Sequence, residues 1–336
     1  MKKGVTIKDI ARKLNMSIST VSKALSNDRS ISAPTKARVH QLAQEWNYIR
    51  NEAARHFKLN KSFTIGLIIP DLLDQFYVLA INGVEKIAEK ENYNVILSQT
   101  HEDVDKEEKI TNVMISNRVD GVIVAITKST LDMVLFQKLI SVGIPVVCIA
   151  RKPTGYSFNY VSSDNKEGSL KAVEFLIKKK HTRIGHIMGP KSMQTCQDRF
   201  EGYKLALHKH KIKYDDGLVK VVDFTKESTI KAMKELMKLK NPPTAIFTFK
   251  NYITIDAIEF LKTKYPERLD VIDFVGFGNL PLLQYMDHKP IAVIDENSFE
   301  MGTRAAELLF EIIKEESSES NVIQQNIQIP CKLIVY

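Results

Sequence analysis

The sequence predicts a small all-α helix-turn-helix domain at the N-terminus, followed by an α/β body of two subdomains with doubly wound parallel sheets. Three observations support this fold class. The net charge is confined to the first 60 residues, which contain 12 Lys or Arg and 4 Asp or Glu, whereas the other 276 contain 36 of each. Short helical patterns occupy the first fifty residues. Beyond residue 62, short apolar runs alternate with longer amphipathic segments.

The stretch DIARKLNMSISTVSKAL contains two short helical patterns joined by a polar turn. Thr6, followed three residues later by Asp9, marks a helix start, so a first helix is expected over residues 6–14. Ser17 can cap a second helix in which the apolar side chains face inward. A third helix is expected to begin near Pro34, because proline is tolerated in the first helical turn.

The positive charge of this segment is typical of a nucleic-acid-binding module. Neutralising phosphates releases counterions, and this release supplies most of the nonspecific affinity. A basic disordered tail is the alternative on charge alone, but the helical patterns argue against a tail. Two short helices, a tight turn and a supporting third helix make a helix-turn-helix, whose second helix enters the major groove with its N-terminus first.

Two groups of residues in this module are expected to contact DNA. The outward face of the second helix is expected to read base edges with Ile18, Ser19, Ser22 and Lys23. A lysine can donate to guanine N7 and O6, and an exposed isoleucine can touch a thymine methyl. The alternative for this isoleucine is packing against the domain's own edge. Hydroxyl and amide donors suited to phosphate contacts are Ser17, Thr20, Asn27, Ser32, Thr35 and Tyr48.

The rest of the chain has the pattern of parallel sheets covered by helices. Apolar runs bounded by turn residues predict strands over residues 63–70, 93–99, 120–126, 145–150, 183–189, 218–224, 244–249 and 273–278. Amphipathic segments between them predict helices over residues 75–90, 105–117, 165–179, 196–210 and 226–240. Such alternation implies helices on both faces of a parallel sheet, and the length of the chain requires two such sheets.

Three segments carry a family resemblance: VTIKDIARKLNMSISTVSKALSN, ISAPTKARVHQLAQEWNYIRNEAARHF and KSFTIGLIIPD. The chain resembles the bacterial lactose-repressor and galactose-repressor family of transcription regulators, and the similar organisation continues to PCKLIVY near residue 336. The N-terminal motif is highly specific, and the remaining segments are less so.

The resemblance implies that NEAARHFK is a hinge helix that folds on DNA, pairs with its dimer mate and lies in the minor groove. Its expected minor-groove contacts are Ala54, Arg55 and Phe57. Family members usually carry Leu at the position of Phe57, and an aromatic ring can also wedge between base pairs and kink the duplex. The alternative is that residues 51–60 form only a flexible basic linker.

The resemblance also implies the domain organisation. The helix-turn-helix domain would cover residues 1–50, the hinge 51–61, and an effector-binding and dimerisation domain 62–336. The last of these would resemble periplasmic sugar-binding proteins, with two similar subdomains and three crossovers. Its subdomains are expected at about 62–160 plus 292–320, and 161–291 plus 321–336. A small-molecule effector is then expected in the cleft at the carboxyl ends of the strands.

The family pattern supplies the expected effector contacts, which are Asp74, Phe76, Tyr77, Arg151, Arg199, Phe224, Lys250, Asn251, Gly278 and Asp295. The sequence departs from the sugar-binding pattern at Ala150 and Gly278, where that pattern has aspartates. Two carboxylates that would accept sugar hydroxyls are therefore missing. Asp164 and Asn165 are more typical of a helix cap than of ligand contacts.

The charges among these contacts bear on the class of effector. Arg151, Arg199 and Lys250 outnumber Asp74 and Asp295, so the cleft is expected to be slightly positive. Guanidinium groups bind acidic ligands in bidentate fashion, which favours an anionic effector such as a sugar acid or a sugar phosphate. The alternative is that the substitutions only reshape the pocket for another sugar.

The combined prediction is a cytoplasmic, sequence-specific DNA-binding transcription regulator. It is expected to act as a repressor, to bind a pseudo-palindromic operator in double-stranded DNA as a homodimer, and to be switched by its effector. Whether the effector releases or strengthens DNA binding does not follow from the sequence. The three separated cysteines are expected to be buried thiols.

Competing classes of protein lack their signatures. A secreted sugar-binding protein predicts an apolar signal peptide and no basic head. A membrane protein predicts an apolar run of about 18 residues, and none occurs. The sequence contains no GxGxxG after a strand, GxxxxGK[ST], HExxH or GxSxG, so neither an enzyme nor a cofactor is expected. No metal site is expected, because acidic or Cys partners at ligand spacing are lacking around His181, His186, His208 and His210.

Overall fold

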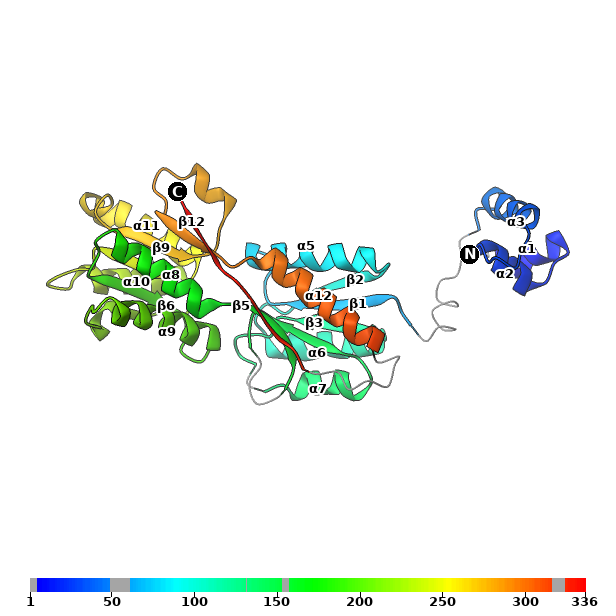
Figure 1. Cartoon of the computed structure of the whole chain (residues 1–336), viewed down its shortest axis with the longest axis horizontal. Helices are drawn as coiled ribbons and strands as arrows, with labels where there is room; N and C mark the ends of the chain where they lie inside the picture. The colour runs from blue at the N-terminus through cyan, green and yellow to red at the C-terminus, as the bar shows by residue number, and fades with distance from the viewer. Residues whose placement is uncertain (1–4, 49–60, 131, 153–156, 316–323) are drawn as a thin grey trace. The chain divides into compact units, whose positions relative to one another are not determined.

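The computed structural model describes residues 5–48, 61–130, 132–152, 157–315 and 324–336. It divides into two compact units, a head over Met1–Ser62 and a body over Phe63–Tyr336. In Figure 1 the helices of the head are drawn in blue, and the body continues from cyan to red.

The head consists of α1 (Ile7–Leu14), α2 (Ile18–Leu25) and α3 (Ala33–Glu45). Thr6 begins α1 as predicted, since its backbone N–H donates to Asp9 Oδ2 at 2.9 Å. Asn15 ends α1 in the left-handed conformation, with φ of 52°, and this turns the chain into α2. The interior of the head is built from Ile10, Ala11, Val21, Ala24, Val39 and Leu42.

The body contains two six-stranded sheets. The first has the order β11-β5-β4-β3-β1-β2 and the second the order β12-β10-β9-β8-β6-β7. The strands of the first sheet are β1 (Thr64–Ile69), β2 (Asn94–Gln99), β3 (Gly121–Val124), β4 (Val146–Ile149), β5 (Asn159–Ser163) and β11 (Asn326–Ile329). Those of the second are β6 (Ile184–Met188), β7 (Val219–Val221), β8 (Ala245–Thr248), β9 (Asp273–Phe277), β10 (Ala292–Asp295) and β12 (Lys332–Val335).

All neighbouring strands are parallel except β12, which runs antiparallel to β10. The buried runs of β1, β3 and β4 are apolar on both faces, because helices cover both sides of the sheet. This arrangement confirms the predicted doubly wound fold of the body.

Helices form the outer layers of each subdomain. In the first subdomain, α5 (Gln75–Lys90) and α12 (Ser298–Glu315) cover one face, and α6 (Val104–Ser116) and α7 (Val134–Ser141) cover the other (Figure 1). In the second, α8 (Asn165–Lys178) and α9 (Gln194–Lys209) lie opposite α10 (Lys226–Met237) and α11 (Asn251–Lys264). Short 3₁₀ turns complete the body: η1 (Asp216–Leu218), η2 (Pro266–Arg268) and η3 (Pro281–Tyr285).

Two glycines allow α5 and α12 to pack in close contact. A Cβ on Gly302 would lie 1.9 Å from the carbonyl oxygen of Ala80, and a Cβ on Gly83 would lie 2.2 Å from that of Phe299. Only a residue without a side chain fits at these positions. The close crossing fixes α12, which follows β10 along the chain, against the first subdomain.

The chain crosses between the subdomains at Asp164, after Asp295, and between Ile329 and Lys332. These points differ from the expected boundaries of the subdomains. β10 pairs with β9, so residues 292–295 belong to the second subdomain rather than to the first. β11 pairs with β5, so residues 326–329 belong to the first. The boundary expected at residue 160 cuts through β5.

The five predicted helices of the body lie within three residues of α5, α6, α8, α9 and α10 at each end. Four strands, β5, β10, β11 and β12, were absent from the sequence prediction. Each has only four or five residues, and β5, β11 and β12 contain polar residues that weaken the apolar signal.

The residues set aside in the sequence analysis occupy ordinary structural positions. All three cysteines are buried and unpaired, as expected. His181 contacts Thr244 and Asp273, each at 2.9 Å, and His186 lies in the core of the second subdomain. Within the part of the chain that the structure describes, no helix is both long and apolar enough to cross a bilayer.

Candidate nucleic-acid interface and ligand cleft

The outward face of α2 carries the four predicted base-reading residues. Ile18 is 46% exposed and is not among the apolar side chains that pack on the interior of the head. Ser19 and Lys23 are exposed, and Ser22 is half-buried. Inward-facing Val21 and Ala24 anchor the opposite side of the helix. The structure therefore presents the predicted face to solvent, as a major-groove reader requires.

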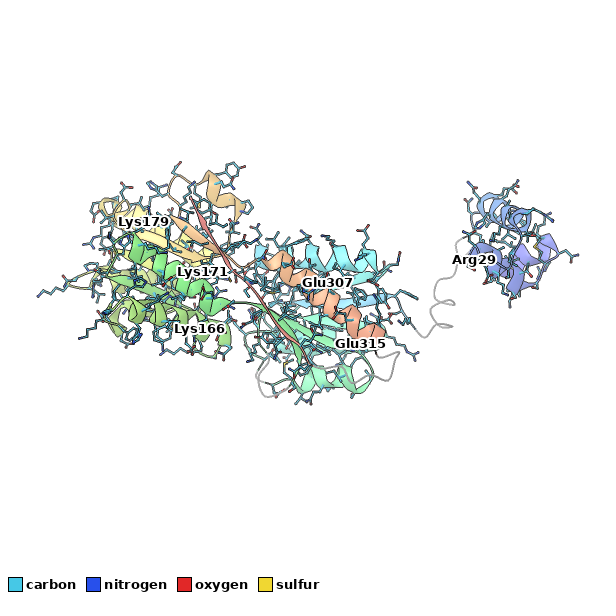
Figure 2. All side chains as sticks on the ribbon, viewed as in Figure 1. Arg29, Lys166, Lys171, Lys179, Glu307 and Glu315 are labelled. Carbon is cyan, nitrogen blue, oxygen red and sulfur yellow. The ribbon has the colours of Figure 1, made fainter. Side chains whose placement is uncertain are left out.

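The cations of the head are mostly free of carboxylates. Within residues 5–48, the ion pair that the structure contains joins Arg12 and Asp9 at 3.7 Å, with the Arg12 side chain 82% exposed. Lys23, Arg29 and Arg38 are exposed and form no ion pair within 4.0 Å with an acidic residue of this range, although the charge of Lys23 helps to lower the pKa of Asp28. Figure 2 labels Arg29, which projects from the head.

Four of the predicted phosphate-contacting residues form two hydroxyl pairs at helix starts. Ser17 caps α2 by accepting from the backbone N–H of Thr20 at 3.0 Å, and the two hydroxyls lie 2.8 Å apart. The hydroxyls of Ser32 and Thr35 lie 2.9 Å apart at the start of α3. Each pair places hydroxyl groups beside the N-terminus of a helix, which is a favourable place for a phosphate.

The remaining DNA-contact predictions fall on the loop after α2 and on the hinge. Asn27 is exposed with a left-handed φ of 56°, and its Oδ1 lies 3.3 Å from His40 Nε2. Tyr48 is half-buried and packs on the interior of the head. The hinge residues Ala54, Arg55 and Phe57 lie outside the described residues.

A cavity of about 240 Å³ lies between the two subdomains of the body. Its walls come from segments that follow β1, β4, β5, β8, β9 and β10, so it lies at the carboxyl ends of both sheets, as expected for this topology. The structure brings all ten predicted effector contacts into its lining: Asp74, Phe76, Tyr77, Arg151, Arg199, Phe224, Lys250, Asn251, Gly278 and Asp295.

Arg151 is held by Glu102, which is not one of the predicted effector contacts. Its Nη2 donates to Glu102 Oε1 at 2.6 Å and its Nη1 donates to Oε2 at 2.9 Å. Burial tends to raise the pKa of Glu102, but its hydrogen bonds with Arg151 and the charge of Arg151 hold this pKa below its ordinary value. The guanidinium is therefore already engaged by a bidentate carboxylate.

Arg199 occupies a similar position in the second subdomain, where it is 3% exposed. Its Nε donates to Asn165 Oδ1 at 2.8 Å, its Nη1 to the carbonyl oxygen of Phe249, and its Nη2 to Glu296 Oε1 at 2.5 Å. Its guanidinium carbon lies 3.6 Å from the centroid of the Phe277 ring. Burial raises the pKa of Glu296, and Arg199 opposes that effect.

Asn165 and Glu296 belong to two of the crossovers between the subdomains. Asp164 caps α8 by accepting from the backbone N–H of Glu167, as predicted. Asn165 instead lines the cavity, so its assignment to a helix cap alone is wrong. Ser163 Oγ donates to the carbonyl oxygen of Glu296 at 2.8 Å, which joins the same two crossovers. Arg199 therefore connects α9, the crossover segments and the cavity.

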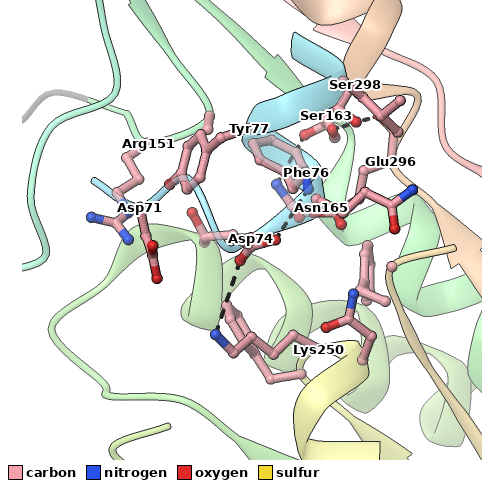
Figure 3. A pocket seen from close by; sticks show the side chains of 18 of the residues that line it. Asp71, Asp74, Phe76, Tyr77, Arg151, Ser163, Asn165, Lys250, Glu296 and Ser298 are labelled. Atoms are coloured by element: carbon pink, nitrogen blue, oxygen red, sulfur yellow. Dashed lines mark hydrogen bonds and ion pairs between the residues drawn. The ribbon is translucent and has the colours of Figure 1, made fainter. Parts of the chain in front are cut away.

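Polar contacts also span the cleft. Asp74 caps α5 through its Oδ1, and its Oδ2 faces Lys250 Nζ across the cavity at 4.0 Å (Figure 3). Tyr252 Oη donates to the carbonyl oxygen of Leu73 at 3.1 Å. Leu73 and Asp74 belong to the first subdomain, whereas Lys250 and Tyr252 belong to the second. Both contacts therefore hold the two walls of the cleft together.

The position of Gly278 explains one departure from the sugar-binding pattern. Its φ is +100°, and a Cβ there would lie 2.5 Å from Asn251 Nδ2. An aspartate at this position would be strained and would displace the amide. The structure provides a carboxylate nearby in Asp295, which accepts from Asn279 Nδ2 at 3.1 Å and from the backbone N–H of Asn297 at 2.8 Å.

Aromatic rings form the apolar part of the lining. Phe224 and Phe249 stack with their centroids 5.1 Å apart, and Phe76 and Tyr77 meet edge to face at 5.1 Å. Burial raises the pKa of Tyr77 far above its ordinary value, so its hydroxyl stays protonated. Flat apolar walls combined with carboxylates suit a ring with hydroxyl groups on its edge.

The expected positive charge of the cleft is wrong. The cations of the lining are Lys128, Arg151, Arg199 and Lys250. Its carboxylates are Asp71, Asp74, Glu102, Asp295 and Glu296. Acids therefore outnumber cations by one in this lining, and carboxylates bind both arginines directly.

Glu102 and Glu296 are not among the effector contacts that the family resemblance implies. A positional signal was available for both of them. Glu296 follows β10 directly, and Glu102 lies three residues after the end of β2. Carboxyl ends of parallel strands meet at one edge of a sheet, so polar residues just after a strand are candidates for the site.

Comparison with known proteins agrees with this architecture. Residues 6–51 match the family model described as bacterial regulatory proteins, lacI family, and residues 65–317 match the periplasmic binding protein domain. The HTH-type transcriptional repressor CytR of Escherichia coli (strain K12) is 32% identical over 310 residues, which cover 91% of this chain and 89% of CytR.

Two solved structures have the same fold. The lac repressor dimer bound to operator and the anti-inducer ONPF has a TM-score of 0.83 at 19% identity, covering 99% of this chain and 98% of the repressor chain. The complex of the transcriptional regulator CelR with cellobiose has a TM-score of 0.72 at 24% identity, covering 98% of each chain. The relatives are regulators and repressors, not enzymes. This chain belongs to the lacI family of bacterial regulatory proteins and is a transcriptional regulator with a DNA-binding helix-turn-helix head and a ligand-binding body of the periplasmic-binding-protein type.

Proposed function

We propose that this protein is a cytoplasmic repressor that binds a pseudo-palindromic operator as a homodimer and is switched by a neutral, hydroxyl-rich ligand in the cleft. The observation that carries the DNA-binding part is the exposed face of α2, where Ile18 and Lys23 project and where Lys23 forms no ion pair within 4.0 Å with a carboxylate of residues 5–48. Free cations on a compact reader suit a polyanionic duplex.

The dimer is supported by exposed apolar side chains at one edge of the first sheet. β2 is the edge strand, and α5 and α6 flank it on opposite faces. Val78, Leu97, Val104 and Val113 on these three elements are between 38% and 51% exposed. A two-fold interface uses the same surface on both copies, so exposed apolar side chains on these neighbouring elements suit self-association. The lac repressor in the structure named above is a dimer bound to operator.

The class of ligand is proposed from the charges of the cleft. Arg151 and Arg199 are already bound to Glu102 and Glu296, so an acidic ligand would have to displace a partly buried carboxylate. Neutral hydroxyls require no such displacement, because carboxylate oxygens with remaining lone pairs can accept from them. A neutral sugar therefore fits better than a sugar acid or a sugar phosphate, and CelR binds cellobiose.

Selection of duplexes from a random pool by the full chain tests the DNA-binding part. The proposal predicts enrichment of sites with two inverted half-sites, and Lys23→Ala is expected to change the enriched half-site. Lys179→Ala, a change on the exposed surface of the body (Figure 2), is expected to leave the selected sequence unchanged. Enrichment of single half-sites would contradict the dimer, and lack of enrichment would contradict sequence-specific binding.

Thermal shift with matched sugars tests the ligand class. D-Glucose and cellobiose are expected to raise the unfolding temperature of the body more than D-glucuronate or D-glucose 6-phosphate do. Tyr214→Phe, which removes a hydroxyl outside the cavity lining, serves as the control and should keep the wild-type response. A larger shift with the two acidic sugars would contradict a neutral ligand.

A further inference from the structure

Tyr336 lies beside the ligand cleft without lining it. β12 pairs antiparallel with β10, and the Tyr336 backbone N–H continues this pairing by donating to the carbonyl oxygen of Ile291 at 3.1 Å. The phenol hydroxyl donates to Asn279 Oδ1 at 3.0 Å, and Lys289 Nζ lies 5.1 Å from the centroid of the ring. The backbone of β12 and this lysine therefore fix the ring beside the loop after β9.

Asn279 connects Tyr336 to a carboxylate of the cavity. Asn279 Nδ2 donates to Asp295 Oδ2 at 3.1 Å. The other carboxylate oxygen, Asp295 Oδ1, accepts from the backbone N–H of Asn297 at 2.8 Å. Both Asn279 and Asp295 line the cavity. A chain of hydrogen bonds therefore runs from the phenol through an amide to the carboxylate.

The chemistry of the chain selects one orientation of the amide. A protonated phenol donates, so it favours the amide oxygen on its own side. The carboxylate only accepts, so it favours the amide N–H group on the other side. If the amide were reversed, its oxygen would face a carboxylate oxygen and its N–H group would no longer bind Asp295. Burial raises the pKa of Tyr336, and the charge of Asp295 raises it further, so the phenol is protonated at neutral pH.

The arrangement leaves Asp295 able to accept from a ligand. A carboxylate has about four acceptor positions, and the two donors described above occupy one on each oxygen. Because a donor binds each oxygen, the orientation of the carboxylate is fixed before a ligand arrives, as in a preorganised acceptor. Asp295 is the last residue of β10, at the carboxyl end of the second sheet, close to the position where the aspartate of the sugar-binding pattern is replaced by Gly278.

We propose that Tyr336 and Asn279 are positioning residues that aim Asp295 at the hydroxyl groups of the effector. The assignment rests on the proposed neutral, hydroxyl-rich ligand and adds a residue from β12's end to the determinants of its binding. Tyr336 acts through Asn279, since it does not reach the cavity itself.

Tyr336→Phe in the full chain tests this role, because it removes only the hydroxyl. The ligand-free unfolding temperature should stay close to that of the wild type. The affinity for D-glucose or cellobiose, whichever gives the larger thermal shift in the wild type, should fall about 3- to 10-fold, as expected for one lost hydrogen bond. The matched control is Tyr214→Phe, because Tyr214 also donates to a side-chain oxygen, Asp216 Oδ1, at 2.8 Å.

A double-mutant cycle separates positioning from a general structural effect. In the Asp295→Asn background, where the carboxylate is gone, adding Tyr336→Phe should cause no further loss of sugar affinity. Independent, additive losses would overturn the proposal, and so would an unchanged affinity in Tyr336→Phe alone.

A measurement without sugar keeps the proposal testable if the ligand class is wrong. In protein labelled with ¹⁵N-asparagine, the side-chain amide of Asn279 is identified by its disappearance in Asn279→Ala. Its protons should exchange several-fold faster in Tyr336→Phe than in the wild type or in Tyr214→Phe. Failure of every neutral sugar to bind would contradict the proposed ligand, whereas an unchanged Asn279 amide in Tyr336→Phe would overturn the positioning role.

Discussion

The head and the cleft of this protein use cations in opposite ways. In the head, Lys23, Arg29 and Arg38 are exposed and form no ion pair within 4.0 Å with an acidic residue of the range 5–48. In the cleft, Arg151 and Arg199 are largely buried, and each is bound to a carboxylate at 2.5 to 2.6 Å. Both regions are rich in positive side chains in the sequence, and only the structure distinguishes them.

The difference shows that the role of a cationic side chain depends on the groups around it. An exposed, unpaired cation loses little hydration before it meets a phosphate, and it releases counterions when it does. A buried arginine needs a compensating carboxylate, because the cost of desolvating an isolated charge is large. The main role of the cleft arginines is therefore to form internal ion pairs, and their remaining N–H groups can donate to a neutral ligand.

The largest effect on stability is expected from breaking the ion pair between Arg199 and Glu296. Arg199→Ala leaves Glu296 buried without its cation and should lower the free energy of unfolding of the body by about 3–5 kcal/mol. Lys250→Ala is the matched comparison, because its contact with Asp74 is 4.0 Å long and both side chains are about one quarter exposed. It should cost less than about 1 kcal/mol. Urea unfolding followed by far-ultraviolet circular dichroism measures both, and equal costs would contradict the distinction.

A buried neutral base provides the next test. His186 is fully buried, stacks on Phe247 at 4.7 Å, and has no hydrogen-bond partner for Nε2 within the described chain. Burial lowers its pKa from 6.5 to about 4, so the unfolded chain binds a proton that the folded chain does not bind between these values. The contribution of neutral His186 to the free energy of unfolding is therefore fully present above pH 6.5 and is lost as the pH falls towards 4.

His186→Phe should remove this part of the pH dependence. The difference in unfolding free energy between pH 7 and pH 4 is expected to be about 3 kcal/mol smaller in the variant than in the wild type. Urea unfolding at the two pH values measures the difference. An identical pH dependence in both proteins would show that the core tolerates the protonated imidazole.

A smaller and more specific effect is expected in the head. Lys23→Ala should weaken binding to the selected operator by about 1–3 kcal/mol and relax the preference at one base pair in each half-site. Competition with operators changed at single positions measures this preference. Equal weakening for every sequence would mean that Lys23 contacts only phosphate.

The sequence was sufficient to predict elements with strong periodicity. The helices of the head, the apolar strands such as β1 and β3, and the ten cleft residues followed from residue patterns and from the family resemblance. Apolar periodicity reflects which face of an element is buried, and burial is the dominant local constraint.

Features that depend on long-range pairing could not be predicted in the same way. β11 and β12 are adjacent in the chain but belong to different sheets, and this placement is set by their partners β5 and β10. The charge of the cleft depends on Glu102 and Glu296, whose roles come from arginines 49 and 97 residues away in the chain. A count of selected residues cannot reveal such neutralisation.

The salt dependence of duplex binding by the full chain tests the central claim most directly. If the free cations of the head neutralise about 6 to 10 phosphates, affinity should fall by roughly 10³- to 10⁵-fold between 50 and 200 mM salt. The stabilisation of the body by a neutral sugar should stay nearly constant over the same range, because the cleft cations are internally paired. Duplex affinity that is insensitive to salt would contradict the account.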